Sequence, residues 1–449
     1  MIDYTLMLAV VAGICLLLVL ILYFKIQAFL SLLICSIAVG LFAGLPPEKI
    51  LASIQSGMAS TLGFIAVIVG LGALFGAILE HSGGVQSLAA SILRKTGERK
   101  ASWALMTTGF IVSIPIFFDV AFIILAPVVF ALQKKSSGSL LFYGIPLVAG
   151  LAVTHAFVPP TPGPVAVAEI LGADLGNVIL TGLMAGIPAA ILAGPIFGRY
   201  ISKRIHVEAP EYFSEKEATT RFPSSSLVAF LIVLPIILII VNNFLSSPLM
   251  KDILIPSGLK STIQMLGHPF IALLIATLLA WYFLGIRKGF SKKALLDISS
   301  KSLAPAGLII LITGAGGVFK QMLTEAGAGK MVAMVMTQYN FSALVFAFLA
   351  AAVIRILQGS ATVAMITSAG MTAAFLEGVQ QTDLQKALIV TAIASGASIF
   401  SHVNDSGFWL ISKYFGLTEK QTLQSWTVTT TIIALTGFIV VLVISFLII

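Results

Sequence analysis

The sequence predicts an all-α polytopic membrane protein with two inverted-topology repeats, each containing a re-entrant hairpin and a broken transmembrane helix. Of its 449 residues 58% are hydrophobic and only 10% are charged, whereas soluble domains average about 25% charged residues. Apolar stretches close to the ~20 residues that cross a bilayer recur along the whole chain. The two halves also share a residue pattern at a nearly constant spacing.

The internal repeat is visible at positions 241 to 244 residues apart. Matching stretches are 29–34 with 270–275, Gly63 with Gly307, Gly70 with Gly314, and 120–121 with 363–364. A constant spacing over so many positions indicates duplication. The expected divisions are a first helix in 1–27, repeat 1 in 28–200, a cytoplasmic linker in 201–225, and repeat 2 in 226–449.

Two apolar segments are predicted to enter the membrane and return as hairpins, at about 102–132 and 340–378. The first has Pro115 and Asp119 at its centre, and the second has Arg355 and the step Gly359–Thr362. A spanning helix is most apolar at its centre, so polar and helix-breaking residues there indicate a turn inside the protein.

Two other segments, 140–171 and 384–412, are predicted to be helices that break in mid-membrane. The first contains the proline-rich step 158–164 and the second contains the polar run 401–406. Hydrocarbon cannot satisfy open backbone or polar side chains, so both breaks should line a cavity in the protein. Paired breaks in two halves are typical of the binding site of a secondary transporter.

The positive charges give the orientation. If the segment with Arg94 and Lys95 is cytoplasmic, most of the 26 Lys and Arg fall on that side, which satisfies the positive-inside rule. Five predicted spans then separate Phe29 from Phe270, so the second repeat enters from the opposite face. Both termini are expected to be external. The net charge of +8 is therefore explained by Lys and Arg residues on the cytoplasmic side of the membrane. The lipid bilayer is the expected partner, and no nucleic acid is expected.

Four titratable residues are candidates for proton coupling: Asp119, Asp405, His155 and His402. Removal from water favours the protonated form of a carboxyl group, so either acid could bind a proton near neutral pH. The alternatives remain a structural helix cap for Asp119 and packed hydrogen-bonding roles for the histidines. Arg355 could contact an anion, or pair with one of the two acids.

Candidate substrate-binding residues are those at the second hairpin tip and in the two breaks. Gly359, Ser360 and Thr362 open a helix whose free N–H groups suit a carboxylate, although ordinary helix capping explains them too. Small polar or glycine residues in the breaks suit a polyhydroxylated ligand or a small cation. These are Thr161 and Gly163 in the first break and Asn404 and Ser406 in the second.

Enzyme chemistry is not predicted. The chain lacks the His-Glu-x-x-His and Gly-x-Ser-x-Gly motifs, and the run Gly314–Gly317 lacks the Lys-Ser/Thr of a phosphate loop, so close helix packing explains it better. Its two cysteines, Cys15 and Cys35, have no metal-ligand spacing. No cofactor or metal is expected, with a proton as coupling ion and sodium left open. A channel is an alternative class of membrane protein, and it would show flux of its substrate without coupling to an ion gradient.

At these positions the chain resembles the gluconate permease family of sugar-acid:proton symporters, within the ion transporter superfamily. The motifs that carry the resemblance are 117–127, 155–164, 358–364 and 402–409. Many relatives have Glu at the position of Asp119 and His at that of Thr161. The resemblance implies a bacterial inner-membrane homodimer with scaffold and transport domains, elevator-like motion, and import of gluconate or a related hydroxy monocarboxylate with a proton. Sodium-coupled carboxylate transport and a D-serine-type amino acid permease are the alternatives.

Overall fold

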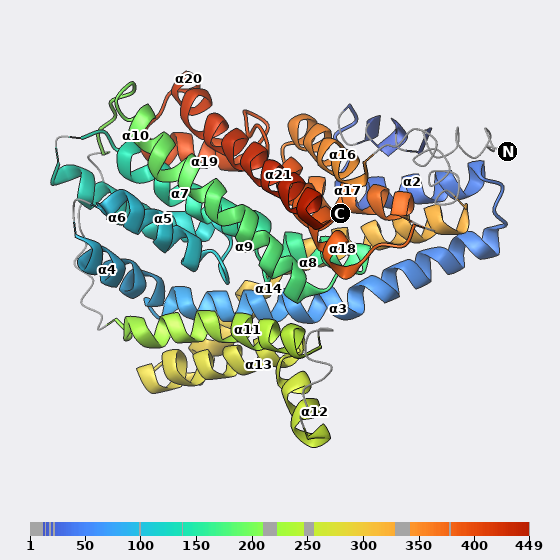
Figure 1. Ribbon diagram of the computed structural model, residues 1–449, viewed down its shortest axis with the longest axis horizontal. Helices are drawn as coiled ribbons and strands as arrows, with labels where there is room; N and C mark the ends of the chain where they lie inside the picture. Colours follow the sequence, from blue (N-terminus) through green and yellow to red (C-terminus); the bar gives the residue numbers. More distant parts are fainter. Residues whose placement is uncertain are drawn as a thin grey trace.

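The computed structural model describes most of the chain and shows only helices there (Figure 1). The described residues are 12–13, 15–17, 19–20, 23–97, 100–136, 138–209, 222–246, 256–327, 342–376 and 379–448. Much of the predicted first helix and the middle of the predicted linker lie outside these residues. The division into domains therefore stays a prediction.

The helices of the first half follow one another in the order expected of one repeat. They are α2 (Ala28–Phe42), α3 (Pro47–His81), α4 (Gly84–Thr96), α5 (Ala101–Val112), α6 (Phe118–Lys134), α7 (Leu141–Phe157), α8 (Pro162–Leu171), α9 (Leu175–Ile191), η2 (Leu192–Ile196) and α10 (Phe197–Ile201).

The second half repeats the main elements of this order after α11 and α12. Its helices are α11 (Ser225–Ser246), α12 (Ser257–Leu266), α13 (Pro269–Ala280), η4 (Trp281–Gly285), η5 (Ile286–Lys288), α14 (Lys292–Glu325), α16 (Ala343–Gln358), α17 (Ala361–Leu376), α18 (Asp383–Ser398), α19 (Ser406–Phe415), α20 (Glu419–Thr422), η6 (Leu423–Thr427) and α21 (Val428–Ile448).

Seven helices of the described chain are long and apolar enough to cross a membrane. They are Pro47–His81, Leu141–Leu171, Leu175–Ile201, Ser225–Leu245, Pro269–Lys288, Lys292–Glu325 and Glu419–Leu447. The chain is thus polytopic, as predicted. The spans expected at 61–80 and 305–324 are each part of a helix that begins more than ten residues earlier.

The two longest helices, α3 and α14, lie along each other and are the equivalent elements of the two repeats (Figure 1). Glycines allow this close approach: a Cβ added to Gly57 of α3 would stand 2.7 Å from the Cα of Val318. Gly317 of α14 faces Gly57 and Thr61 with equally little room. The prediction that the glycine run of 314–317 serves helix packing is confirmed.

Both predicted hairpins and both predicted breaks are present in the backbone. Residues 113–117 separate α5 from α6, and Gly359 and Ser360 separate α16 from α17, with Gly359 at φ +90°. Helices α7 and α8 are separated by 158–161, and α18 and α19 by 399–405.

The two breaks have different local causes. In the first, Pro159 and Pro160 lack the N–H that would continue α7, and a proline also forces the residue before it into an extended conformation, as seen at Val158. Pro162 then begins α8, where its fixed φ suits a helix start. In the second break Ile399 is extended and Phe400 has φ +48°.

Helices α5 and α7 of the first hairpin region approach through glycines, so added volume there should destabilise the fold. A Cβ on Gly150 would press on backbone atoms of Met106 and Phe110, whereas one on Gly307 of α14 would meet nothing within 4 Å. We expect Gly150→Ala to lower the free energy of unfolding by about 1–3 kcal/mol and Gly307→Ala to leave it unchanged or raise it slightly. Thermal unfolding of the purified protein in detergent tests this, and equal midpoints for the two variants would contradict it.

Candidate functional site

The site is built where four helices begin inside the molecule. These are α6 after the first hairpin tip, α8 after the first break, α17 after the second hairpin tip, and α19 after the second break. Helix starts have unpaired N–H groups and the positive end of the helix dipole. The following contacts link these four starts into one region.

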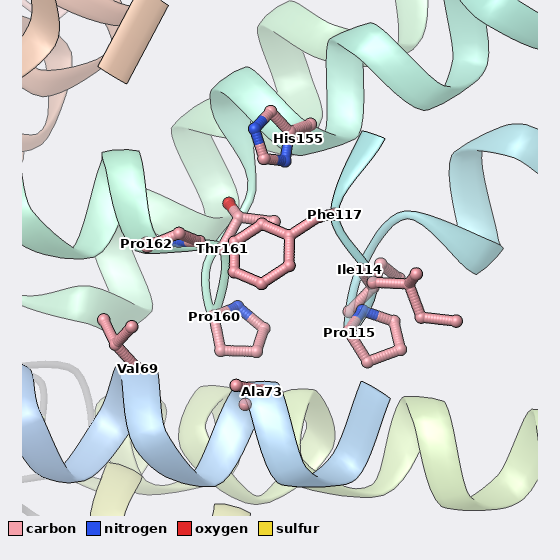
Figure 2. A pocket seen from close by; sticks show the side chains of 11 residues that line it. Val69, Ala73, Ile114, Pro115, Phe117, His155, Pro160, Thr161 and Pro162 are labelled. Atoms are coloured by element: carbon pink, nitrogen blue, oxygen red, sulfur yellow. The ribbon is translucent and has the colours of Figure 1, made fainter. Parts of the chain in front are cut away.

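The first hairpin tip lies against the first break and against α3. Together they enclose a cavity lined by Val69, Gly72, Ala73, Ile114, Pro115, Ile116, Phe117, His155, Pro160, Thr161 and Pro162 (Figure 2). The cavity has a volume of about 20 Å³, which is enough for about one water molecule. A ligand larger than water therefore needs a displacement of the tip or of α3 to fit into this cavity.

His155 and Thr161 contribute the polar groups of this cavity. The His155 ring lies 6.2 Å from the Phe117 ring between centroids, and its buried Nδ1 has no hydrogen-bond partner among the described residues. The Thr161 hydroxyl donates to the carbonyl oxygen of Val158 at 2.6 Å. Thr161 thus closes the turn of the break, while His155 keeps an unsatisfied ring nitrogen in the protein interior.

The second break is tied to the end of α16. The Asn404 amide donates to the carbonyl oxygens of Ile356 at 2.9 Å and Leu357 at 3.2 Å. His402 Nε2 lies 2.7 Å from the same Ile356 oxygen and donates to it in the tautomer with a proton on Nε2. These side chains satisfy the last carbonyls of α16, which a helix otherwise leaves open. Their predicted roles toward substrate and proton stay predictions beside this structural one.

Asp405 forms a buried ion pair with Arg355. Arg355 Nη2 donates to Asp405 Oδ2 at 2.5 Å, and the two side chains are only 6% and 12% exposed. The carboxylate also accepts from the Ser401 hydroxyl and, at 3.1 Å, from the backbone N–H of Gly407, so that it caps the start of α19. Of the two roles predicted for Arg355, pairing with an acid is the one the geometry shows.

The ion pair is connected to the first hairpin through an aromatic contact. Trp426 donates its indole N–H to the Ser401 hydroxyl at 2.7 Å, and its ring stacks on Phe118 with centroids 5.4 Å apart. Phe118 is the first residue of α6. Sequence reasoning missed Trp426, although an aromatic residue with an N–H donor beside Ser425 in an otherwise apolar span was a usable signal.

Asp119, the second residue of α6, is exposed and has no hydrogen-bond or ion-pair partner among the described residues. It lies close enough to Asp405 for the two carboxylates to interact electrostatically. The first and second predicted coupling acids are thus brought together. They differ sharply in environment, since Asp405 is paired and Asp119 is not.

The second hairpin tip lies against the second break. A Cβ added to Gly359 would press on backbone and side-chain atoms of Asn404. Ser360 caps α17 by accepting from the N–H of Val363 at 3.3 Å, while Thr362 is partly exposed. Across the site, Gly163 of α8 lies against Met365 of α17. Gly359, Asn404 and Gly163 therefore place the starts of α8, α17 and α19 next to one another.

This arrangement suits a small anion. Helix starts present N–H groups and positive dipole ends toward the region, and the hydroxyls of Thr362 and Ser406 remain available because Ser406 is exposed. Within the described residues no group of three or more His, Cys, Asp or Glu side chains has the geometry of a metal site.

The Arg355–Asp405 pair should be essential for stability, because removing either partner leaves a buried charge. We expect Arg355→Met and Asp405→Asn each to cost about 3–5 kcal/mol, and the double variant to cost clearly less than their sum. The control is Lys49→Met, which breaks the Lys49–Glu325 pair with side chains 60% and 35% exposed and should cost about 1 kcal/mol or less. The free energies of unfolding of all variants in detergent complete the double-mutant cycle. A loss in the double variant equal to the sum of the two single losses would refute the energetic coupling of Arg355 and Asp405.

Comparison with known proteins agrees with this architecture. The chain is 39% identical over 435 residues to the gluconate permease of Pseudomonas aeruginosa, covering 96% of this chain and 95% of that protein. It is 38% identical over 442 residues to the Gnt-II system L-idonate transporter of Escherichia coli K12, covering 97% and 98%. The crystal structure of the Alcanivorax borkumensis YdaH transporter superposes with a TM-score of 0.63 at 14% identity, over 90% of both chains.

The structural likeness confirms the predicted fold class. The model of the GntP family permeases matches residues 4–447, nearly the whole chain. The chain is a multi-pass membrane permease rather than an enzyme, and it belongs to the GntP permease family.

Proposed function

We propose that this permease imports gluconate or a closely related small sugar acid across the bacterial inner membrane together with a proton. Relatives that it matches over nearly their full length are named for gluconate and L-idonate transport. The observation that carries the proposal is that four helices begin in one region, where Asp119 is a carboxyl group with no hydrogen-bond or ion-pair partner among the described residues.

The sugar acid supplies one negative charge and several hydroxyl groups, and the site has complementary parts for both. The start of α17 at Ser360 and Thr362 holds the carboxylate with backbone N–H groups and hydroxyls. The two breaks bind the hydroxyls of the ligand, with Ser406 and the open backbone near Gly163 as the nearest polar groups.

Asp119 is the proton carrier in this proposal. Asp405 is held by Arg355, Ser401 and the Gly407 N–H. Asp119 has no such partners among the described residues, so it can exchange a proton without breaking an ion pair. His155, with its unpartnered Nδ1 in the adjacent cavity, assists. Proton and anion then cross as a neutral unit with a lower desolvation cost.

The remaining parts of the proposal are the orientation with both termini outside, a homodimer, and an elevator-like motion of the hairpins and broken helices against α3 and α14. They rest on the charge distribution and on the family resemblance. The small cavity at the first hairpin tip supports a moving interface there, because it is too small for a sugar acid as described.

The coupling is tested with purified protein in proteoliposomes. Under an inward proton gradient we expect concentrative uptake of radiolabelled gluconate that a protonophore abolishes and that does not require sodium. Asp119→Asn should lose concentrative uptake, because the amide cannot exchange a proton. Uptake driven by sodium after collapse of the pH gradient would show that sodium, not the proton, is the coupling ion. Uptake of an amino acid instead of a sugar acid would contradict the proposed substrate.

The carboxylate site is tested at the second hairpin tip. Loss of a hydrogen bond to a charged group costs about 1.5–3 kcal/mol, so Thr362→Val should raise KM for gluconate roughly 10-fold to 100-fold with a smaller change in maximal rate. Thr262→Val is the matched control, because its hydroxyl donates within α12 to Gly258 O, away from the site. An unchanged KM in Thr362→Val would exclude this residue from the substrate site.

A further inference from the structure

A second cavity continues the first one toward the end of α3. It is lined by Ala73, Gly76, Ala77, Glu80, His81, Pro115, Ile116, Phe117, Val120, Ile298, Lys301, Ser302 and Pro305. It shares Ala73 and residues 115–117 with the cavity that contains His155. This cavity has a volume of about 200 Å³, which is enough for several water molecules.

One face of α3 forms the floor of both cavities. Gly72 and Ala73 lie beneath the first cavity, and Gly76, Ala77 and Glu80 follow at helical spacing along the second. From Gly72 to Glu80 the helix rises about 12 Å. Small residues keep this face open until the carboxylate of Glu80.

The two cavities are separated at the first hairpin tip. The Pro115 carbonyl packs on Gly76 so closely that a Cβ there would clash with it. Phe117 lines both cavities, and Figure 2 shows its ring in the smaller one. Phe117 and Val120, which lie two residues before and one residue after Asp119, line the larger cavity. The start of α6, which carries Asp119, therefore borders the space that reaches Glu80.

Glu80 differs from Glu325, the carboxylate at the end of the matching helix in the other repeat. Glu325, at the end of α14, accepts from Gln321 at 3.1 Å and pairs with Lys49 at 3.7 Å. Glu80 is half-buried and has no hydrogen-bond or ion-pair partner among the described residues. The other titratable groups lining its cavity are His81, whose Nδ1 lies 2.9 Å from Ala77 O, and Lys301, which pairs with Asp297 at 2.9 Å.

We infer that Glu80 is the group that takes up the coupled proton on its way out of the site, with Phe117 as the gate between the two cavities. The proton carried by Asp119 passes by way of the cavity that contains His155, and past the Phe117 ring, to water in the larger cavity. The Glu80 carboxylate accepts it from this water and then releases it to bulk water beyond the end of α3. This assignment rests on the proton coupling proposed above and adds the residue and route of release.

The functional experiment compares Glu80→Gln with Glu325→Gln in proteoliposomes. Two rates are measured for gluconate: net uptake driven by a proton gradient, and exchange of labelled for unlabelled gluconate at equal pH. Glu80→Gln should lose net uptake at least 10-fold and keep exchange, because exchange needs no net proton release, and Glu80→Asp should restore net uptake. Glu325→Gln should keep both. Parallel loss of both rates in Glu80→Gln, or loss of neither, would overturn the assignment.

A second experiment needs no substrate and so separates this inference from the proposed function. In a background with Cys15→Ser and Cys35→Ser, Ala77→Cys should react with a small water-soluble methanethiosulfonate. Val69→Cys, which lines only the smaller cavity, should react slowly, and at least 10-fold faster when combined with Phe117→Ala. Equal rates for Val69→Cys with and without the Phe117 ring would show that Phe117 is no gate, even if gluconate proves not to be the substrate.

Discussion

The need to satisfy polar backbone groups away from water determines this structure. Every interruption of a membrane helix exposes carbonyl and N–H groups that hydrocarbon cannot bond. The second break meets this need with its own side chains, since Asn404 and His402 bond to the end of α16. The first break meets it with prolines, which remove N–H donors, and with the hydroxyl of Thr161. The second solution requires the second hairpin to lie against its break. The first hairpin tip also lies against the first break, although that break satisfies its own groups.

The Arg355–Asp405 pair gives the two acids of the site different roles. An arginine buried in a membrane protein is tolerated chiefly when paired, and here its partner is also the cap of α19. Because Asp405 is paired and caps α19, a change at Asp405 would break both contacts, whereas Asp119 makes no hydrogen bond or ion pair among the described residues. The Trp426–Phe118 stack joins the pair to the first residue of α6, so the paired and the unpaired acid are held at a fixed separation.

Sequence patterns predicted the fold well because its interruptions have strong local causes. Proline steps and polar residues in apolar segments identified both breaks, and the helix ends lie within a few residues of the expected bounds. The long N-terminal extensions of α3 and α14 were not predicted, because residues 47–60 and 292–304 are too polar to be recognised as membrane spans. The stability they gain comes from packing against each other through glycines, which no local pattern reveals.

The sequence predicted which residues belong to the candidate site, but not which contacts each of them makes. Spacing placed Asp119, Asp405, His402 and Asn404 at the same depth, yet it could not show which side chains bond to one another. That depends on contacts between segments some fifty residues apart, such as Arg355 with Asp405. For the same reason the surroundings of Glu80 and Glu325, which both lie near the ends of the matching helices α3 and α14, could not be predicted: Lys49, near the start of α3, pairs with Glu325. Packing left Glu80 beside a cavity, and this difference in surroundings, which the sequence pattern does not show, is the basis of the role inferred for Glu80.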